Sequence, residues 1–363
     1  MRYLGNKTRL VPFILRSIER LGISPGVACD PFSGTASVSS ALKRSGWRVH
    51  SGDLLSASYA LQVARVELDR TPRYPIDVLP AKDRIGSSWV SYRKLLAWLE
   101  RTPARDGFMT EHYTLGGRAG RAHGRMYFSR ENAARIDAIR DAIAGWEERG
   151  LLDAARAQLL IATLIEAADR VANTTGVYAS FVKTLQPNAR RTLELRPILP
   201  TRPVNGGGAC SAFRGPAVEL LRALGPQDLL YLDPPYNARQ YPGYYHIPEL
   251  LAVGWSPPPR IRGKTGLIPD EDLRSDWCRR GRAAAALEAV LDAADARHVL
   301  LSYNDEGLLE RGEIETRLRE WGTDDSYRLL TLPYRRYRSD ADGPGRTYVR
   351  DRVREHLHYV RCA

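Results

Sequence analysis

Residues 233–236 combine a carboxylate, two prolines and a phenol ring in the order Asp-Pro-Pro-Tyr. They follow the apolar run 229–232 (LLYL), which has the character of a strand buried in a parallel sheet. Because proline cannot donate a hydrogen bond to a neighbouring strand, the strand must end here. We therefore expect the tetrapeptide at the carboxyl edge of a sheet, where open α/β folds bind ligands.

These groups suit the attack of a flat aromatic amine on an electrophile. Asp233 can accept one N–H of an exocyclic amino group, the carbonyl of Pro234 can accept the other, and Tyr236 can stack on the ring. With both hydrogens held, the lone pair of the nitrogen points out of the ring plane. An acidic strand end before a Pro-Pro turn is also common in proteins without this chemistry, so the tetrapeptide alone is not specific.

Two segments near the N-terminus offer groups for a second ligand. The loop 2–7 (RYLGNK) precedes a predicted helix over 8–21 with Thr8 as its N-cap, and it is either a ligand-closing loop or a solvated arm. A predicted strand, the turn PFSGTA and a helix follow over 26–43, an arrangement that presents free N–H groups to a ligand. The turn lacks the full glycine pattern of dinucleotide and P-loop sites. A cofactor with a carboxylate and an adenosine group but no phosphate therefore fits better.

Asp53 follows the next predicted strand, 47–51, about 20 residues beyond that turn. An acidic residue at this place accepts hydrogen bonds from ribose hydroxyls. It is equally suited to cap the helix predicted over 54–68, and the two roles are compatible.

The elements that position these groups belong to a basic chain of 363 residues, long enough for about two domains. Its net charge is +12 and its pI is near 9.7, and only six of its 54 basic residues are lysines. A GC-rich genome would explain arginine over lysine but not the excess of positive charge, which indicates a polyanionic partner. The segment 101–130, expected to be a loop, mixes arginines with aromatic residues; this suits a nucleic-acid surface, with a solvated loop as the alternative.

The four cysteines (Cys29, Cys210, Cys278 and Cys362) are far apart and predict neither a zinc site nor a disulfide framework. The sequence also has no apolar signal core at its N-terminus and no apolar stretch near 18 residues long. We expect a cytoplasmic protein without a membrane span.

Taken together, the segments resemble the Dam-like (class D12 type) DNA adenine methyltransferases, which use S-adenosylmethionine (AdoMet). The segments that carry the resemblance are RYLGNK at 2–7, DPFSGTA at 30–36, Asp53, DPPYNARQY at 233–241, LLSYNDEG at 300–307, YRRY at 334–337 and DRVREHLHYV at 351–360. The resemblance implies a Rossmann-like α/β fold whose sheet is mainly parallel with an antiparallel last hairpin. It further implies a catalytic domain made of 1–72 and 208–363, and a largely helical insertion, 73–207, that recognises the DNA target.

The resemblance also implies roles for particular residues. The catalytic residues would be Asp233, Pro234, Pro235 and Tyr236; the AdoMet site would use Tyr3, Gly5, Asn6, Lys7, Asp30, Pro31, Phe32, Ser33, Gly34, Thr35 and Asp53. Candidate DNA contacts are Arg118, Arg121, Arg125, Lys183, Arg239, Tyr241, Arg335 and Arg336. No metal is expected, because the sulfonium of AdoMet already activates the methyl group.

The expected activity is therefore site-specific methylation of double-stranded DNA on the exocyclic amine of a flipped base, with S-adenosylhomocysteine as product. Adenine N6 is favoured over cytosine N4, since aspartate at the first position is the habit of adenine enzymes. An RNA or protein amide methyltransferase and a catalytically silent DNA-binding protein stay as alternatives of other classes. The expected partners are DNA, with which the protein would associate in the nucleoid, and a cognate restriction endonuclease that acts separately.

Overall fold

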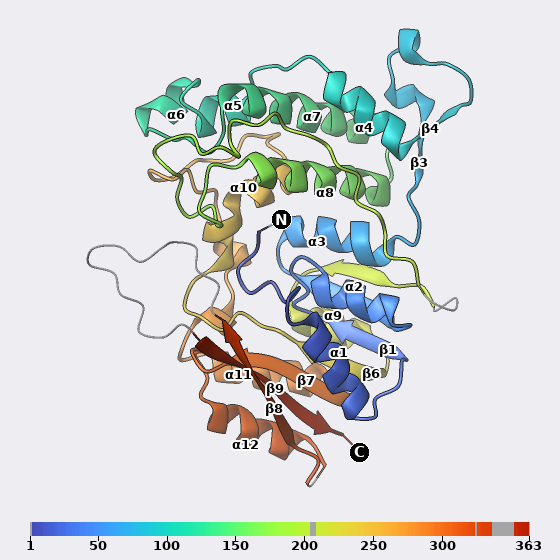
Figure 1. The fold of residues 1–363 in the computed structure, drawn as a ribbon, viewed down its shortest axis with the longest axis vertical. Coiled ribbons are helices and arrows are strands. Elements are labelled where there is room, and N and C mark those ends of the chain that lie inside the picture. Colours follow the sequence, from blue (N-terminus) through green and yellow to red (C-terminus); the bar gives the residue numbers. More distant parts are fainter. Residues whose placement is uncertain (1, 204–207, 324, 336–351, 363) are drawn as a thin grey trace. The chain divides into compact units, whose positions relative to one another are not determined.

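The computed structural model describes residues 2–203, 208–323, 325–335 and 352–362 (Figure 1). The chain divides into two compact units. The helical unit comprises Met1–Leu4, Val63–Pro200 and Pro242–Glu271, and the sheet unit comprises Gly5–Gln62, Thr201–Tyr241 and Asp272–Ala363. The expected insertion, 73–207, thus differs from the helical unit, which begins ten residues earlier, ends at residue 200 and also takes in the segments 1–4 and 242–271.

The sheet unit is built on a 7-stranded sheet of order β5-β2-β1-β6-β7-β9-β8. Its strands are β1 (Val27–Asp30), β2 (Arg48–Asp53), β5 (Ser211–Arg214), β6 (Gln227–Leu232), β7 (Ala296–Asn304), β8 (Arg328–Arg335) and β9 (Arg352–Arg361). The five strands from β5 to β7 are parallel, whereas β9 runs antiparallel to both β7 and β8. This confirms the expectation of a mainly parallel sheet with an antiparallel last hairpin.

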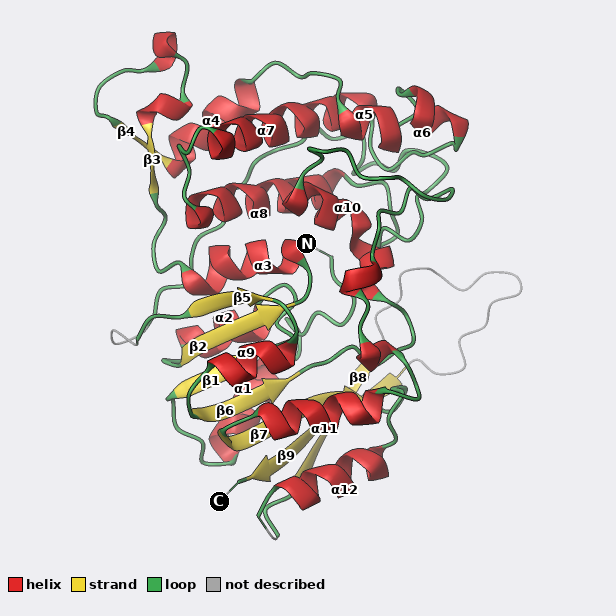
Figure 2. Ribbon diagram, turned by 180° about the vertical axis from the view of Figure 1, so that it is seen from behind, coloured by secondary structure: helices red, strands yellow, loops and turns green. Residues whose placement is uncertain are grey.

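Helices cover both faces of this sheet. Figure 1 shows α1 (Val11–Arg20) and α2 (Ser37–Arg44) in front of one face, and Figure 2 shows α9 (Ala217–Ala223), α11 (Ala283–Ala293) and α12 (Arg311–Trp321) in front of the other. The helix α3 (Ser56–Gln62) follows β2. Such a two-sided cover buries both faces of the parallel strands, which explains why β6 reads as a continuous apolar run.

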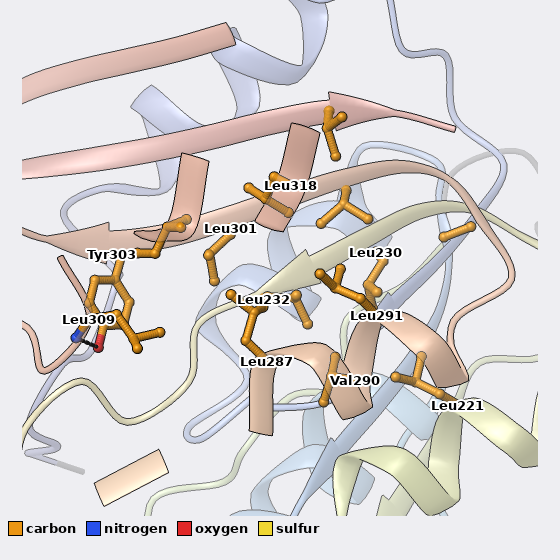
Figure 3. Packing of buried hydrophobic residues seen from close by; sticks show 14 of the residues in the cluster. Leu221, Leu230, Leu232, Leu287, Val290, Leu291, Leu301, Tyr303, Leu309 and Leu318 are labelled. Atoms are coloured by element: carbon orange, nitrogen blue, oxygen red, sulfur yellow. Dashed lines mark hydrogen bonds between the residues drawn. The ribbon is translucent and has the colours of Figure 1, made fainter. Parts of the chain in front are cut away.

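The α9, α11 and α12 face of the sheet holds an apolar cluster of this unit (Figure 3). Leu230 and Leu232 of β6, Leu301 of β7 and Leu287 of α11 belong to this cluster, with Leu287 beside Leu232. Because successive side chains of a strand point to opposite faces, the residues between them, such as Tyr231, point to the other face. Polar groups at the carboxyl ends of the strands thus collect on the face that α1 and α2 cover.

Strand register brings several acidic residues to one edge. Cys29 of β1 pairs with Leu230 of β6, and continuing this register places Asp30 beside Tyr231. Strand β9 is antiparallel to β7, with Glu355 opposite Asn304. The beginning of β9 therefore lies at the same edge as the carboxyl ends of the parallel strands.

The helical unit contains α4 (Tyr92–Arg101), α5 (Phe108–Tyr113), α6 (Arg118–Ala122), α7 (Arg130–Glu148), α8 (Ala154–Val171) and most of α10 (Tyr241–Val253). The interpretation of 101–130 as one loop is wrong, because α5 and α6 lie within it. Before α4, Trp89–Ser91 forms β4 and pairs with β3 (Arg73–Pro75). In the described chain, no helix has both the length and the apolar character needed to cross a bilayer.

Candidate active site

The turn after β1 is fastened to the end of β2. The N–H of Ser33 donates to the carbonyl of Gly52 at 2.9 Å, and the N–H of Gly34 donates to Asp53 Oδ2 at 3.0 Å. Asp53 Oδ1 accepts the N–H of Leu55 at 2.9 Å and so also serves the start of α3. Gly34 has φ of +51°, a conformation that favours glycine. The two acidic strand ends and the turn between them thus form one connected structure.

The N-terminal loop is braced against the same turn. Asn6 Nδ2 donates to Thr35 Oγ1 at 2.9 Å, while Asn6 Oδ1 accepts the N–H of Thr8 at 2.8 Å. Thr8 therefore closes a local turn with Asn6 instead of capping a helix, since α1 begins three residues later at Val11 with Leu10 as its N-cap. The expectation of Thr8 as N-cap is wrong.

Asp30 ends β1 as a carboxylate almost without solvent contact, with 1% of its surface exposed. Its Oδ2 accepts the hydroxyl of Ser39 at 2.5 Å, whereas its Oδ1 makes no hydrogen bond within the described residues. Burial raises the pKa of Asp30 to about 7, although the Ser39 hydroxyl opposes the shift. A buried acceptor oxygen that lacks a donor among the described residues is available to a cationic or N–H group.

Lys7 lies between two carboxylates at the carboxyl edge of the sheet. Its Nζ is 3.2 Å from Asp233 Oδ1 and also donates to Glu355 Oε1. Ser302 of β7 donates its hydroxyl to the same Glu355 oxygen at 2.9 Å. Lys7 and Glu355 are 4% and 5% exposed, so their charges are satisfied by one another and not by water.

The proton affinities in this cluster follow from burial and from two negative charges around one positive charge. Burial raises the pKa of Asp233 to about 7; Lys7 opposes this shift, and Glu355 adds to it. Burial by itself would lower the pKa of Lys7, but Asp233 and Glu355 together outweigh it and hold that pKa well above its usual range. Lys7 is therefore a fixed ammonium, and Asp233 is the group that titrates near neutral pH.

Tyr236 is held beside this cluster. Its carbonyl accepts the N–H of Leu308 at 2.9 Å, its ring meets Tyr303 edge to face with centroids 6.0 Å apart, and Lys7 Nζ is 5.4 Å from its ring centre. Gly5 has φ of +79°, and a Cβ placed there would lie 3.6 Å from the Tyr236 hydroxyl. Residues 5–7, the tetrapeptide 233–236 and the turn 30–36 thus gather at one edge of the sheet unit.

A family model matches residues 3–316 of the chain, and its description reads D12 class N6 adenine-specific DNA methyltransferase. The match covers the turn, the tetrapeptide and the intervening helical segments. The chain belongs to this family. It is therefore a site-specific DNA methyltransferase that modifies adenine N6.

Known relatives agree with this assignment. The methyltransferase is 33% identical over 365 residues to the type II methyltransferase M.NlaIII of Neisseria lactamica, and the alignment spans 99% of both chains. It is 27% identical over 364 residues to M.CviAII of Paramecium bursaria Chlorella virus 1, covering 99% of this chain and 97% of the relative. It is also 34% identical over 346 residues to M.FokI of Planomicrobium okeanokoites, covering 93% of this chain but only half of that longer relative.

The methyltransferase brings most residues of the expected cofactor site together, with one exception. Residues 5–7, 30–35 and Asp53 belong to the sheet unit, where Pro31 is buried and Phe32 packs edge to face on Trp277. Tyr3 belongs to the helical unit, where its ring stacks on Tyr245 at 4.5 Å between centroids. Tyr3, near the start of the RYLGNK segment, is therefore held within the helical unit, whereas residues 5–7 belong to the sheet unit.

The candidate DNA contacts differ in exposure. Arg118, Arg121, Lys183 and Arg239 are exposed, and Tyr241 is half-buried. Arg125, in contrast, is 2% exposed, and its guanidinium donates to the carbonyls of Lys264, His112 and Gly263. Its guanidinium donors thus hold the helical unit together instead of facing DNA. The side chain of Arg335 and all of Arg336 lie outside the described residues.

Sequence reasoning missed Glu355 and Ser302 as members of the site. Glu355 stands in the last strand, between Arg354 and His356, where it is buried and paired with Lys7. An acidic residue on the inward face of an alternating strand was the available signal. No group of three or more histidine, cysteine or acidic side chains suited to a metal ion occurs among the residues that the structure describes.

Proposed function

We propose that this methyltransferase transfers the methyl group of AdoMet to N6 of an adenine flipped out of double-stranded DNA, with Asp233 as the residue that receives the amino group. The observation that carries the proposal is the position of Asp233. Its carboxylate lies just after β6, at the carboxyl edge of the sheet, where Oδ1 forms an ion pair with Lys7. The strand beside β6 is β1, which leads into the Asp30 turn.

The residues of the turn fit AdoMet. The buried Asp30 Oδ1, without a donor among the described residues, suits the ammonium of the methionine part of AdoMet. Asp53 is only partly buried at the end of β2 and suits the ribose hydroxyls, since a carboxylate can accept several hydrogen bonds at once. Gly34, which has no Cβ, would let the backbone approach the cofactor closely.

Bound AdoMet supplies a methyl group already activated by its sulfonium charge, so that the amine nitrogen gains a carbon, sulfur keeps the bonding electrons and one proton must leave the nitrogen. The chain positions the amine and stabilises the positive charge that grows on it. Asp233 accepts one N–H and the carbonyl of Pro234 accepts the other, while Tyr236 lies against the ring. Pro235 keeps the tetrapeptide from continuing the strand.

The helical unit is the proposed DNA-recognition unit. Its exposed Arg118, Arg121 and Lys183 suit phosphate contacts, and Arg239 and Tyr241 of the sheet unit suit the DNA near the flipped base. Since relatives are named type II methyltransferases, we further propose that a cognate restriction endonuclease accompanies this enzyme.

Methylation of unmodified duplex DNA with labelled AdoMet, followed by mass spectrometry of the nucleosides, tests the proposal. N6-methyladenine is the expected product, and sequencing of the modified bases gives the target site. N4-methylcytosine as the main product, or methylation of RNA in place of DNA, would overturn it.

A further inference from the structure

We propose that Glu355 of the last antiparallel strand is a positioning residue for methyl transfer: it shares the Lys7 ammonium with Asp233 and so keeps Asp233 a strong enough proton acceptor for the methylated amine. This inference rests on the proposed role of Asp233 and deepens it. It also gives the β8–β9 hairpin, far from the tetrapeptide in sequence, a part in the chemistry.

The geometry supports a shared cation. One Nζ atom contacts both Asp233 Oδ1, at 3.2 Å, and Glu355 Oε1, so the two carboxylates share one ammonium. The hydroxyl of Ser302 holds Glu355 Oε1 from the neighbouring strand at 2.9 Å. Lys7, Glu355 and Ser302 are 4%, 5% and 0% exposed, which excludes solvent from competing for these contacts.

Charge explains why a second carboxylate matters. A cation that faced Asp233 alone would favour its ionised form and make it a weak proton acceptor. Glu355 draws on the same ammonium and adds a negative charge, so it offsets part of the effect of Lys7 on Asp233. A base that titrates near the working pH is the more effective one.

Other titratable groups also face Asp233. They are Lys7 from the loop before α1, Asp30 from β1, Tyr231 from β6, Tyr236 from the tetrapeptide and Glu355 from β9. Tyr231 is buried beside the cluster, and burial together with Asp233 holds the pKa of its hydroxyl well above the usual range. Tyr231 and Tyr236 are thus neutral at the pH of the reaction. Asp30 is also a carboxyl group, but it lies in the turn assigned to the cofactor. Glu355 is the remaining charge that substitution can remove without touching the proposed ligands.

The test compares pH profiles of single-turnover methyl transfer on duplex DNA for Glu355→Gln and the wild-type enzyme. Glutamine keeps an oxygen for Lys7 and Ser302 but removes the charge. We expect the acidic limb of the profile to move to lower pH and the plateau rate to fall by about tenfold, because Asp233 becomes a weaker base. An unchanged acidic limb, with or without a lower plateau, would overturn the inference and leave Glu355 a structural residue.

A matched control and a reverse variant complete the design. Asp228→Asn removes a carboxylate at the opposite end of β6, where it accepts the N–H of Val27 at 2.8 Å, and should leave the limb unmoved. In Lys7→Met, the acidic limb of the pH profile should move to higher pH. In the double variant Lys7→Met/Glu355→Gln, this limb should return to lower pH. The last comparison decides the inference even if Glu355→Gln alone does not fold. Absence of N6-methyladenine from the wild-type reaction would instead refute the proposed function.

Discussion

Asp53 holds the N–H of Gly34 with one carboxylate oxygen, at 3.0 Å, and the N–H of Leu55 with the other, at 2.9 Å. A single side chain therefore ties the turn after β1 to the start of α3. The same carboxylate is the proposed partner of the ribose of AdoMet. Removing the Asp53 side chain should therefore change both the conformation of the turn and the affinity for the ribose.

Asp53→Ala should weaken AdoMet binding more than it slows the methyl-transfer step. A hydrogen bond to a charged acceptor contributes about 1.5 to 3 kcal/mol, so the Kd should rise by about tenfold or more. Titration calorimetry with AdoMet and with S-adenosylhomocysteine measures this, with Asp228→Asn as the control. A Kd within twofold of the wild-type value would contradict the assignment of Asp53.

The rate of methyl transfer should fall on the acidic side of neutrality. Burial raises the pKa of Asp233 to about 7, so the carboxylate needed to accept the amine is lost as the pH drops through that value. At pH 6 the single-turnover rate should be about a tenth of its plateau, which lies above pH 8. A rate that stays constant down to pH 5.5 would show that protonation of Asp233 does not limit the reaction.

Arg125→Ala should destabilise the enzyme without acting chiefly on DNA binding. The substitution removes the guanidinium that donates to three carbonyl oxygens in the helical unit, those of Lys264, His112 and Gly263. The free energy of unfolding should fall by about 3 kcal/mol, as measured by denaturant titration. The exposed Arg118 serves as the comparison, and Arg118→Ala should change stability by less than about 0.5 kcal/mol.

Arg118→Ala and Lys183→Ala should weaken DNA binding in a salt-dependent way. Each lost phosphate contact should reduce the slope of log K against log salt by about 1, whatever the DNA sequence. Fluorescence anisotropy with target and non-target duplexes at several salt concentrations measures both slopes. If neither variant alters the slope, these two residues do not contact phosphates.

The sheet and much of the site could be predicted from the sequence because the signals are local. The apolar run of β6 and its two prolines fix where that strand ends, and the spacing from the turn to Asp53 fixes the next acidic strand end. The helix α10 was not foreseen, since Pro242, Gly243 and Pro248 all disfavour helix and only packing with distant segments stabilises it.

The burial of charged residues could not be predicted, because it depends on contacts between distant parts of the chain. Arg125 reads as one more surface arginine in a glycine-rich stretch until carbonyl oxygens from residues 263 and 264 are placed around it. Glu355 reads as an exposed strand residue until Lys7, almost the whole chain away, is paired with it. The spacing of residues along the sequence does not indicate which distant residues will pair.

Single-turnover methyl transfer by Asp233→Ala, measured beside its AdoMet affinity, tests directly whether Asp233 receives the amine. We expect the rate to fall by about a thousandfold or more, while the Kd for AdoMet stays within a few fold of the wild-type value. If the variant methylates adenine at the wild-type rate, Asp233 is not the group that receives the amine.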